Sequence, residues 1–152
     1  MATSTPTTLA DLTARTGLDV LAHIEREVAV PVIAGLQAQG DLIVVPWQLL
    51  ADVTVPSTAR WQEVPAAGVV LLRGAAGGNP HTLVADAGTC RWTRTVEDPE
   101  GLALAVVENT AVVHLVHPEH GGSGIAPGRY VVRRQREGGT EAGLRGHRLI
   151  VD

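Results

Sequence analysis

From residue 41 onward, the chain is divided into short apolar segments by clusters of glycine, proline, asparagine and aspartate. Runs rich in valine, leucine and threonine alternate with turn sequences such as 98–101, Asn109-Thr110 and 121–124. Within the last of these, we expect Gly122-Ser123-Gly124 to be a flexible loop. Segments of this length and composition, with no helical period between them, predict strands. The expected strands are 41–45, 69–73, 82–85, 90–96, 102–108, 111–117, 129–136 and 148–151. Many short strands without helical crossovers predict a mainly β fold, either an antiparallel sandwich or a partly closed barrel.

Before residue 40 the pattern is helical. Apolar residues recur at three- and four-residue steps, which is the spacing of one helical face: Leu9, Leu12, Leu18, Leu21, Ile24 and Val28. Asp19 is a suitable N-cap for a helix over about 20–29. A second short helix is expected over 32–39, because Pro31 can occupy the first position of a helix and Gly40 can end it.

These patterns divide the chain into a disordered tail over 1–8, a helical N-terminal arm over 9–39 and a β domain over 40–152. With 152 residues, of which 45% are hydrophobic and 18% charged, the chain is long enough to bury a core. Cys90 is the single cysteine, which excludes an intrachain disulfide and favours a reducing compartment. No apolar stretch approaches the roughly 20 residues that span a bilayer. We therefore expect a cytoplasmic protein that does not enter a membrane.

Charge is distributed unevenly along the chain. All 12 cationic side chains are arginine, against 16 acidic side chains, so the formal net charge is −4. Six of the arginines lie in 121–152, where there are three acidic residues, and thirteen acidic residues lie in 1–120. Such polarity favours association between copies of the chain or with another protein. The arginines of strand 129–136 alternate between its two faces with Tyr130 as the one aromatic neighbour, so nucleic acid is not the expected partner. Charged protection of a sheet edge would explain the same arginines.

Three histidines are the strongest candidates for chemistry. His117 stands at the end of a predicted strand, His120 follows it in a turn, and His81 opens another strand. Imidazole is the commonest metal ligand in proteins. One hypothesis is a divalent ion, zinc or iron, held by His81, His117 and His120, with Glu119 as fourth ligand or as base for a metal-bound water. The alternative needs no cofactor: His117 and Glu119 cap a turn through hydrogen bonds, and His120 is solvated.

Three sequence elements carry a resemblance: Gly78-Asn79-Pro80-His81, His117-Pro118-Glu119-His120, and the segment 126–137 that begins Ala-Pro-Gly-Arg-Tyr-Val-Val-Arg. They resemble a small uncharacterised bacterial family with Gly-His-x-His, His-x-Glu-His and Pro-Gly-x-Tyr-x-Val-x-Arg-Gln-Arg-Glu elements. The resemblance covers about 40–137 and implies a shared β domain but no activity. Asn79 stands where the family has its first histidine, which favours a structural or binding role over a catalytic metal.

Two functional hypotheses follow. The first is a non-enzymatic structural or interaction module that self-associates or docks on a partner protein, because the chain has no complete catalytic constellation. Its interface would be formed by the apolar helix face and the arginine strand: Leu18, Leu21, Ile24, Val28, Arg133, Arg134 and Arg136. The second is a small metal-dependent hydrolase, in which Glu119 accepts a proton from water bound at the three-histidine site. The first is the leading hypothesis.

Overall fold

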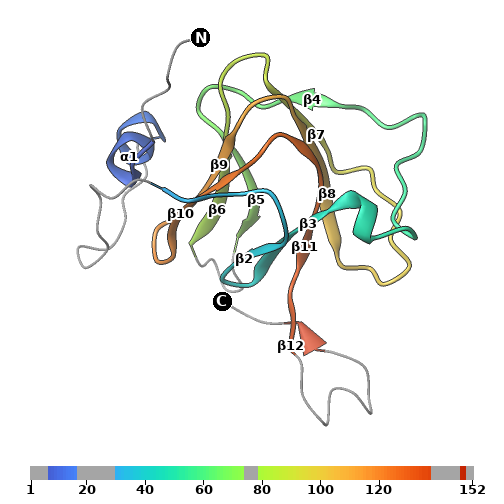
Figure 1. Ribbon diagram of the computed structural model, residues 1–152. Coiled ribbons are helices and arrows are strands. Elements are labelled where there is room, and N and C mark those ends of the chain that lie inside the picture. The colour runs from blue at the N-terminus through green and yellow to red at the C-terminus, as the bar shows by residue number, and fades with distance from the viewer. Residues whose placement is uncertain (1–6, 17–29, 74–78, 138–147, 150–152) are drawn as a thin grey trace.

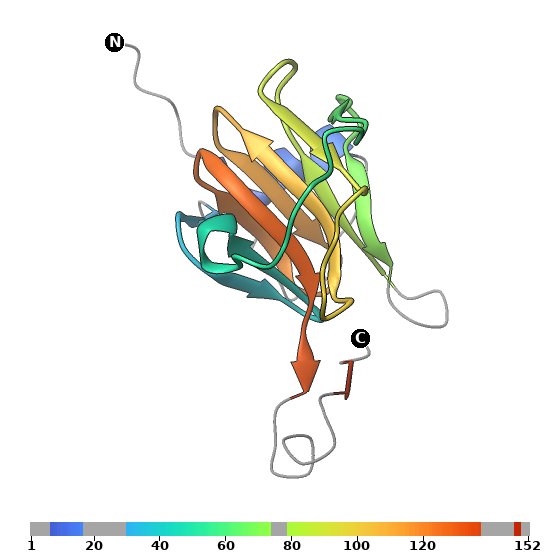
Figure 2. The ribbon, with the colours of Figure 1, turned by 90° about the vertical axis from the view of Figure 1, so that its right-hand side faces the viewer.

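The fold is a sandwich of two β-sheets with a short helix against one of them. The computed structural model describes residues 7–16, 30–73, 79–137 and 148–149. One sheet has the order β1-β10-β9-β6-β5 and the other the order β2-β3-β11-β8-β7-β4. Figures 1 and 2 show the two layers and the helix beside the smaller sheet. The prediction of a mainly β sandwich is confirmed.

The smaller sheet consists of β1 (Val32–Ile33), β10 (Gly121–Ile125), β9 (Val113–His117), β6 (Pro80–Val84) and β5 (Val69–Arg73). The larger sheet consists of β2 (Gln37–Gln39), β3 (Leu42–Pro46), β11 (Gly128–Arg134), β8 (Ala103–Asn109), β7 (Cys90–Thr93) and β4 (Gln62–Glu63). A separate pair joins β12 (Arg136–Glu137) to β13 (Arg148–Leu149). Within the described residues, β1 and β10 run parallel and the other named pairs are antiparallel.

The main core lies between the two sheets. Because successive side chains of a strand point to opposite faces, alternate residues of each strand enter it. Leu42 and Val44 of β3 meet Leu83 of β6 and Leu115 of β9, and all four are at most 1% exposed. A second apolar cluster on the outer face of the smaller sheet joins Val84 and Val116 to three residues from the N-terminal region: Leu9, Leu12 and Val30.

The helix α1 (Leu9–Thr16) covers the outer face of the smaller sheet through Leu9 and Leu12. It begins with a capping box, because Thr8 and Asp11 exchange two backbone-to-side-chain hydrogen bonds of 2.9 and 3.2 Å. The predicted helix over 20–29 lies outside the described residues. Among the residues described, no helix is long and apolar enough to cross a membrane.

The predicted helix over 32–39 is wrong. Residues 32–39 instead form β1 and β2, which place this segment in both sheets. Gln37 and Gln39 alternate with exposed Ala38 and are buried, and their side-chain amides donate to the carbonyl oxygens of Gly124 and Leu115. These two cross-sheet hydrogen bonds need the two-residue period of a strand, so tertiary contacts override the helix-start signal at Pro31.

The expectation for 121–124 is also wrong, because this turn sequence, with its expected flexible loop over 122–124, is part of strand β10. The glycines have a packing reason. A Cβ atom on Gly122 would lie 3.2 Å from methyl groups of both Leu9 and Leu12, and one on Gly124 would lie 2.8 Å from Val32 Cγ2. The helix and β1 occupy the space that side chains of β10 would fill. All eight segments that were predicted as strands do contain strand residues.

The open edge of β5 is protected by a side chain. Arg94 donates to the carbonyl oxygens of Val70 and Leu71, at 2.6 and 3.3 Å. Its guanidinium also lies 5.0 Å above the ring of Trp92, which is buried in the core. A charged group on edge carbonyls hinders pairing with another strand.

Candidate functional sites

The structure brings the three predicted histidines together and adds two partners that sequence reasoning missed. His81 on β6 is fully buried, and its ring nitrogens face the larger sheet. Nδ1 lies 2.9 Å from Gln39 Oε1, and Nε2 lies 3.0 Å from Asp41 Oδ1. Asp41, which lies between β2 and β3, is itself only 5% exposed. His81 therefore links the two sheets at the end where β2 and β3 meet.

The hydrogen bonds determine how His81 is protonated. Gln39 Nε2 donates to Leu115 O, so its Oε1 faces the imidazole and accepts from Nδ1–H. Nε2 lies within hydrogen-bond distance of the Asp41 carboxyl group, so both ring nitrogens of His81 have partners inside the protein.

His117, at the end of β9, has the hydrogen bonds of a turn cap. Its Nδ1 accepts from the backbone N–H groups of Glu119 and His120, at 3.0 and 3.2 Å. Its side chain is buried, whereas His120 is exposed. The ring centroids lie 4.3 Å apart for His81 and His117 and 4.5 Å apart for His117 and His120. Three imidazoles therefore lie in a row from the interior to the surface, with neighbouring rings tilted by 39° and 38°.

Asn79, which stands where the family has a histidine, holds the side chain of Glu119. Asn79 Nδ2 donates to Glu119 Oε1 at 2.9 Å. Among the described residues, no group of three or more histidine, cysteine, aspartate or glutamate side chains is arranged so that it could hold a metal ion. The metal site of His81, His117 and His120 stays a prediction.

The predicted interface residues are only partly placed. Leu18, Leu21, Ile24 and Val28 lie outside the described residues. Arg133 is mostly covered, since its side chain is 11% exposed and its Nη2 lies 3.4 Å from Glu100 and 3.8 Å from Asp98. Arg134 is exposed, and the backbone of Arg136 pairs with β13.

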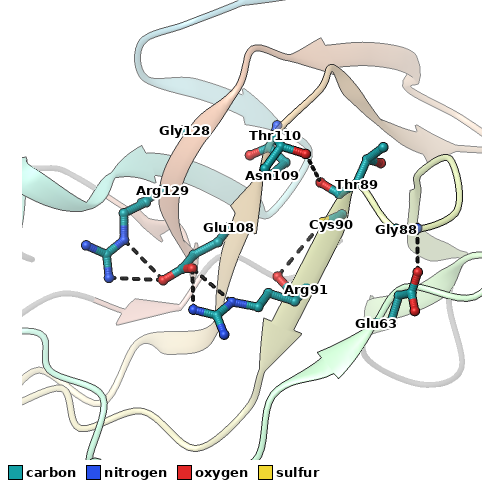
Figure 3. A pocket seen from close by; sticks show the side chains of 10 residues that line it. All are labelled: Glu63, Gly88, Thr89, Cys90, Arg91, Glu108, Asn109, Thr110, Gly128 and Arg129. Carbon is teal, nitrogen blue, oxygen red and sulfur yellow. Dashed lines mark hydrogen bonds and ion pairs between the residues drawn. The ribbon is translucent and has the colours of Figure 1, made fainter.

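A second site lies on the outer face of the larger sheet. Glu108 of β8 stands in register between Arg129 of β11 and Arg91 of β7. Its Oε1 lies 3.0 Å from Arg129 Nη2, and its Oε2 lies 2.7 Å from Arg91 Nη2. Figure 3 shows the two guanidinium groups reaching the one carboxylate from opposite sides.

Tryptophan rings support both arginines. The guanidinium of Arg91 lies 4.4 Å from the ring centre of Trp61, and that of Arg129 lies 4.6 Å from the ring centre of Trp47. Trp47, in a short 3-10 helix over Trp47–Leu49, donates from Nε1 to Val53 O at 2.8 Å. We call Trp47, Arg129, Glu108, Arg91 and Trp61 the Trp–Arg row.

The Trp–Arg row borders two hollows. The larger, of about 500 Å³, is drawn in Figure 3 and extends past Arg91 and Glu108 to Thr89 and Thr110. The smaller, of about 320 Å³, lies between Arg129 and the segment 47–51. Cys90 lines the larger hollow, but burial raises the pKa of its thiol to about 12, so it is protonated at neutral pH and is a poor nucleophile.

No sequence motif indicates the Trp–Arg row. Its three charged residues come from strands far apart in the chain, and only the register of β7, β8 and β11 aligns them. The one available signal was that each falls within a segment predicted to be a strand.

The fold and these sites define a β-sandwich domain with a buried polar cluster and an exposed Trp–Arg row. Residues 38–135 match the model of a family described as a domain of unknown function, DUF8820. The chain belongs to this family, which confirms the resemblance to an uncharacterised family. The match includes the histidine cluster and the whole Trp–Arg row, whereas α1 and β1 lie outside it. No curated protein and no solved structure matches the chain.

Proposed function

We propose that the chain is a non-enzymatic interaction module that docks on a partner protein through the outer face of its larger sheet. The Trp–Arg row carries this proposal. The side chains of Arg91 and Arg129 are 54% and 63% exposed, beside a hollow of about 500 Å³. Tryptophan and arginine are the residue types most enriched among those that dominate binding energy at protein interfaces.

The row is held in place before any partner arrives. Each guanidinium is fixed by a tryptophan ring on one side and by Glu108 on the other. Exposed ion pairs contribute only about 0–1 kcal/mol to stability. Ordered side chains lose little further conformational freedom on binding, which favours association. Binding therefore accounts for this arrangement better than stability does.

The histidine cluster supports a non-enzymatic role. Both nitrogens of His81 and the Nδ1 of His117 form hydrogen bonds within the protein. The partner can be a second copy of the chain, and in that case the module forms homo-oligomers. The single cysteine supports a reducing, cytoplasmic setting.

Site-specific photo-crosslinking in cells tests the proposal. A photo-reactive residue at Thr110, on the wall of the larger hollow, is compared with one at exposed Ala14 on α1. We expect one protein, or a second copy of the chain, to crosslink from position 110 and not from position 14. The complex should re-form from purified components and weaken in an Arg91→Gln/Arg129→Gln variant. Equal crosslinking from both positions, or a complex indifferent to the variant, would contradict the proposal.

A small metal-dependent hydrolase is the second candidate, because His81, His117 and His120 are neighbours and Glu119 lies in the turn beside them. Elemental analysis of protein purified without a histidine tag tests it directly, since one equivalent of zinc or iron is required. His117→Ala separates the two roles of that residue. A lost metal ligand lowers the melting temperature only in metal-loaded samples. A lost turn cap costs about 0.5–1.5 kcal/mol with or without chelator, and we expect this second result.

A further inference from the structure

We infer that the Trp–Arg row and its two hollows form one groove that binds an extended acidic segment of a partner protein. This inference rests on the proposed interaction function and specifies the chemistry of the partner. It is carried by the adjacency of the two hollows at Arg129, by the unused donors of the two arginines and by the position of Glu108 between them.

The two hollows are neighbours, because Arg129 lines both. Together they cross the larger sheet from β7 over β8 and β11 toward Trp47, which directly follows β3. Neighbouring strands lie about 4.8 Å apart, so three such steps span about 15 Å. An extended peptide rises about 3.3 Å per residue, so the groove accommodates about four to five residues. This is the length of a short linear segment.

The charge of the Trp–Arg row favours an anionic occupant beside the two arginines. The second carboxylate on the wall of the larger hollow, that of Glu63, accepts from Gly88 N–H. Arg91 and Arg129 each use Nε and Nη2 on the single carboxylate of Glu108. Over the described part of the chain, the Nη1 groups of both arginines have no hydrogen-bond partner. The row therefore carries one uncompensated positive charge and offers a donor on each side of Glu108. Hydrogen bonds from guanidinium to carboxylate are among the strongest that side chains form.

The spacing favours separate carboxylates over one phosphate group. Arg91 and Arg129 belong to strands two steps apart, about 10 Å. Glu108 lies between them and would repel a phosphate placed at the centre of the row. Carboxylates on alternate residues of an extended segment recur about every 7 Å, so a run of them spans the distance between the two arginines, which one phosphate group does not. Because a guanidinium already covers a face of Trp47 and of Trp61, the groove is also poorly suited to stacking nucleic-acid bases.

Fluorescence anisotropy with labelled eight-residue peptides tests the inference on the full chain. The probes are an alternating Glu-Ala peptide, a matched Gln-Ala peptide and an oligonucleotide of eight nucleotides. We expect the acidic peptide to bind at least about tenfold more tightly than the neutral one, since a charged hydrogen bond contributes that much. Binding should weaken as salt rises. Equal binding of the two peptides, or tighter binding of the oligonucleotide, would overturn the inference.

Variants locate the binding. Arg91→Gln/Arg129→Gln should lose about tenfold in affinity for the acidic peptide, whereas Arg134→Gln, an exposed arginine on the same sheet, should stay within about twofold. Glu108→Gln raises the charge of the row and should strengthen binding, a gain that a purely structural role of Glu108 does not predict. Circular dichroism melting checks that each variant folds. A double variant that binds as wild type, or a Glu108→Gln variant that binds more weakly while folded, would overturn the inference.

The two proposals can fail separately. If a partner crosslinks at position 110 but the acidic peptide does not bind, the interaction function stands and the acidic segment is wrong. If position 110 crosslinks no more than position 14 and the peptide does not bind, both are wrong.

Discussion

His81 is the single residue on which most of the polar interior depends. It is fully buried, and its two nitrogens meet Gln39 and Asp41 from the opposite sheet. Burying a charged or polar group is costly unless each of its hydrogen bonds is formed. Removing the imidazole would leave a buried carboxylate and a buried amide oxygen unpaired, so the cost falls on the partners as much as on His81.

We predict that His81→Ala and Asp41→Ala each lower the free energy of unfolding by about 3–5 kcal/mol. The double variant should lose clearly less than the sum, because the second substitution removes a group that has already lost its partner. Urea unfolding at pH 7 measures all three. As a control, His114→Ala combined with Asp41→Ala should be additive within about 0.5 kcal/mol, since His114 points to the outer face of β9. Additive losses for His81 and Asp41 would contradict this pairing.

The histidines could be grouped from the sequence, but their partners could not. His117 and His120 are close in the chain, and His81 lies one strand pair away, so strand patterning was sufficient. Gln39 and Asp41 contact a residue that is 40 or more positions away and on the other sheet. Gln39 was interpreted as the end of a helix, which hid the alternation that turns Gln37 and Gln39 inward, and Asp41 was interpreted only as the start of a strand.

At the scale of elements, the turn before β8 shows how one carboxylate organises a strand start. Asp98 Oδ1 accepts from the N–H of Glu100, and Oδ2 accepts from the N–H groups of Leu102 and Ala103. Burial alone would raise the pKa of Asp98. The three backbone hydrogen bonds, with the nearby Arg133 charge, outweigh burial and hold the pKa of Asp98 below its usual value.

This direction of the pKa shift predicts how stability depends on pH. A carboxyl group whose pKa is lowered by folding adds stability above its unfolded pKa of about 4, and that stability is lost as the pH falls through the folded pKa. Asp98→Asn should therefore cost about 1–3 kcal/mol at pH 7 and flatten the loss of stability below pH 4. Urea midpoints at pH 7 and pH 3 measure both effects. Asp52→Asn removes the same charge at an exposed site and should change neither.

The glycine strand β10 offers a second test among the elements. Gly122→Val should lower stability by about 1–3 kcal/mol, because its side chain needs the space that Leu9 and Leu12 fill. Hydrogen exchange should rise in α1, which is pushed from the sheet. The matched control is Gly35→Ala, where a Cβ atom would have nothing within 4 Å and the change should stay within about 0.5 kcal/mol. Unchanged protection of α1 in Gly122→Val would contradict this packing.

Strands were predictable where the sequence shows runs or alternation of apolar side chains, and they were missed where it does not. Strands such as β5 and β8 have apolar residues on alternate or both faces, so the strand pattern is present in the sequence. In β10 the glycines leave space for Leu9, Leu12 and Val32, which pack on the strand. The sequence of β10 by itself does not show that these residues pack there. The short strands β1, β2 and β4 have two or three residues each, which is too few for a period to show.

At the scale of the whole molecule, apolar clusters lie between the two sheets and on the outer face of each sheet, and two of them differ in their relation to the family match. The cluster between the sheets lies within the family match, whereas Leu9, Leu12 and Val30 of the outer cluster precede it. The sandwich could be predicted as a class from the number and spacing of strands. The face of the sandwich that the N-terminal region covers could not be predicted, because it depends on the space that the glycines of β10 leave.

We predict that Leu12→Ala loosens the N-terminal region without opening the sandwich. The substitution should cost about 2–5 kcal/mol as a buried cavity. Hydrogen exchange should accelerate in α1 and β10 before it does in β8 and β11, which lie in the other layer. Leu49→Ala is the control, because this leucine is 65% exposed. Equal acceleration in both sheets would mean that the two clusters unfold as one.

The arginine above each tryptophan ring gives the protein an optical readout of its own. Trp47 and Trp61 border the groove, while Trp92, 8% exposed, lies in the core. Indole emission responds to the charge and polarity beside the ring. An occupant that draws Arg91 and Arg129 away from their rings should therefore change the emission of Trp61 and Trp47. The emission of Trp92 should stay constant and serve as an internal reference. Titration of the unlabelled chain with an acidic peptide should then shift part of the emission, and quenching by iodide should decrease only for the two surface indoles. Occupancy of the groove can be followed with no added dye.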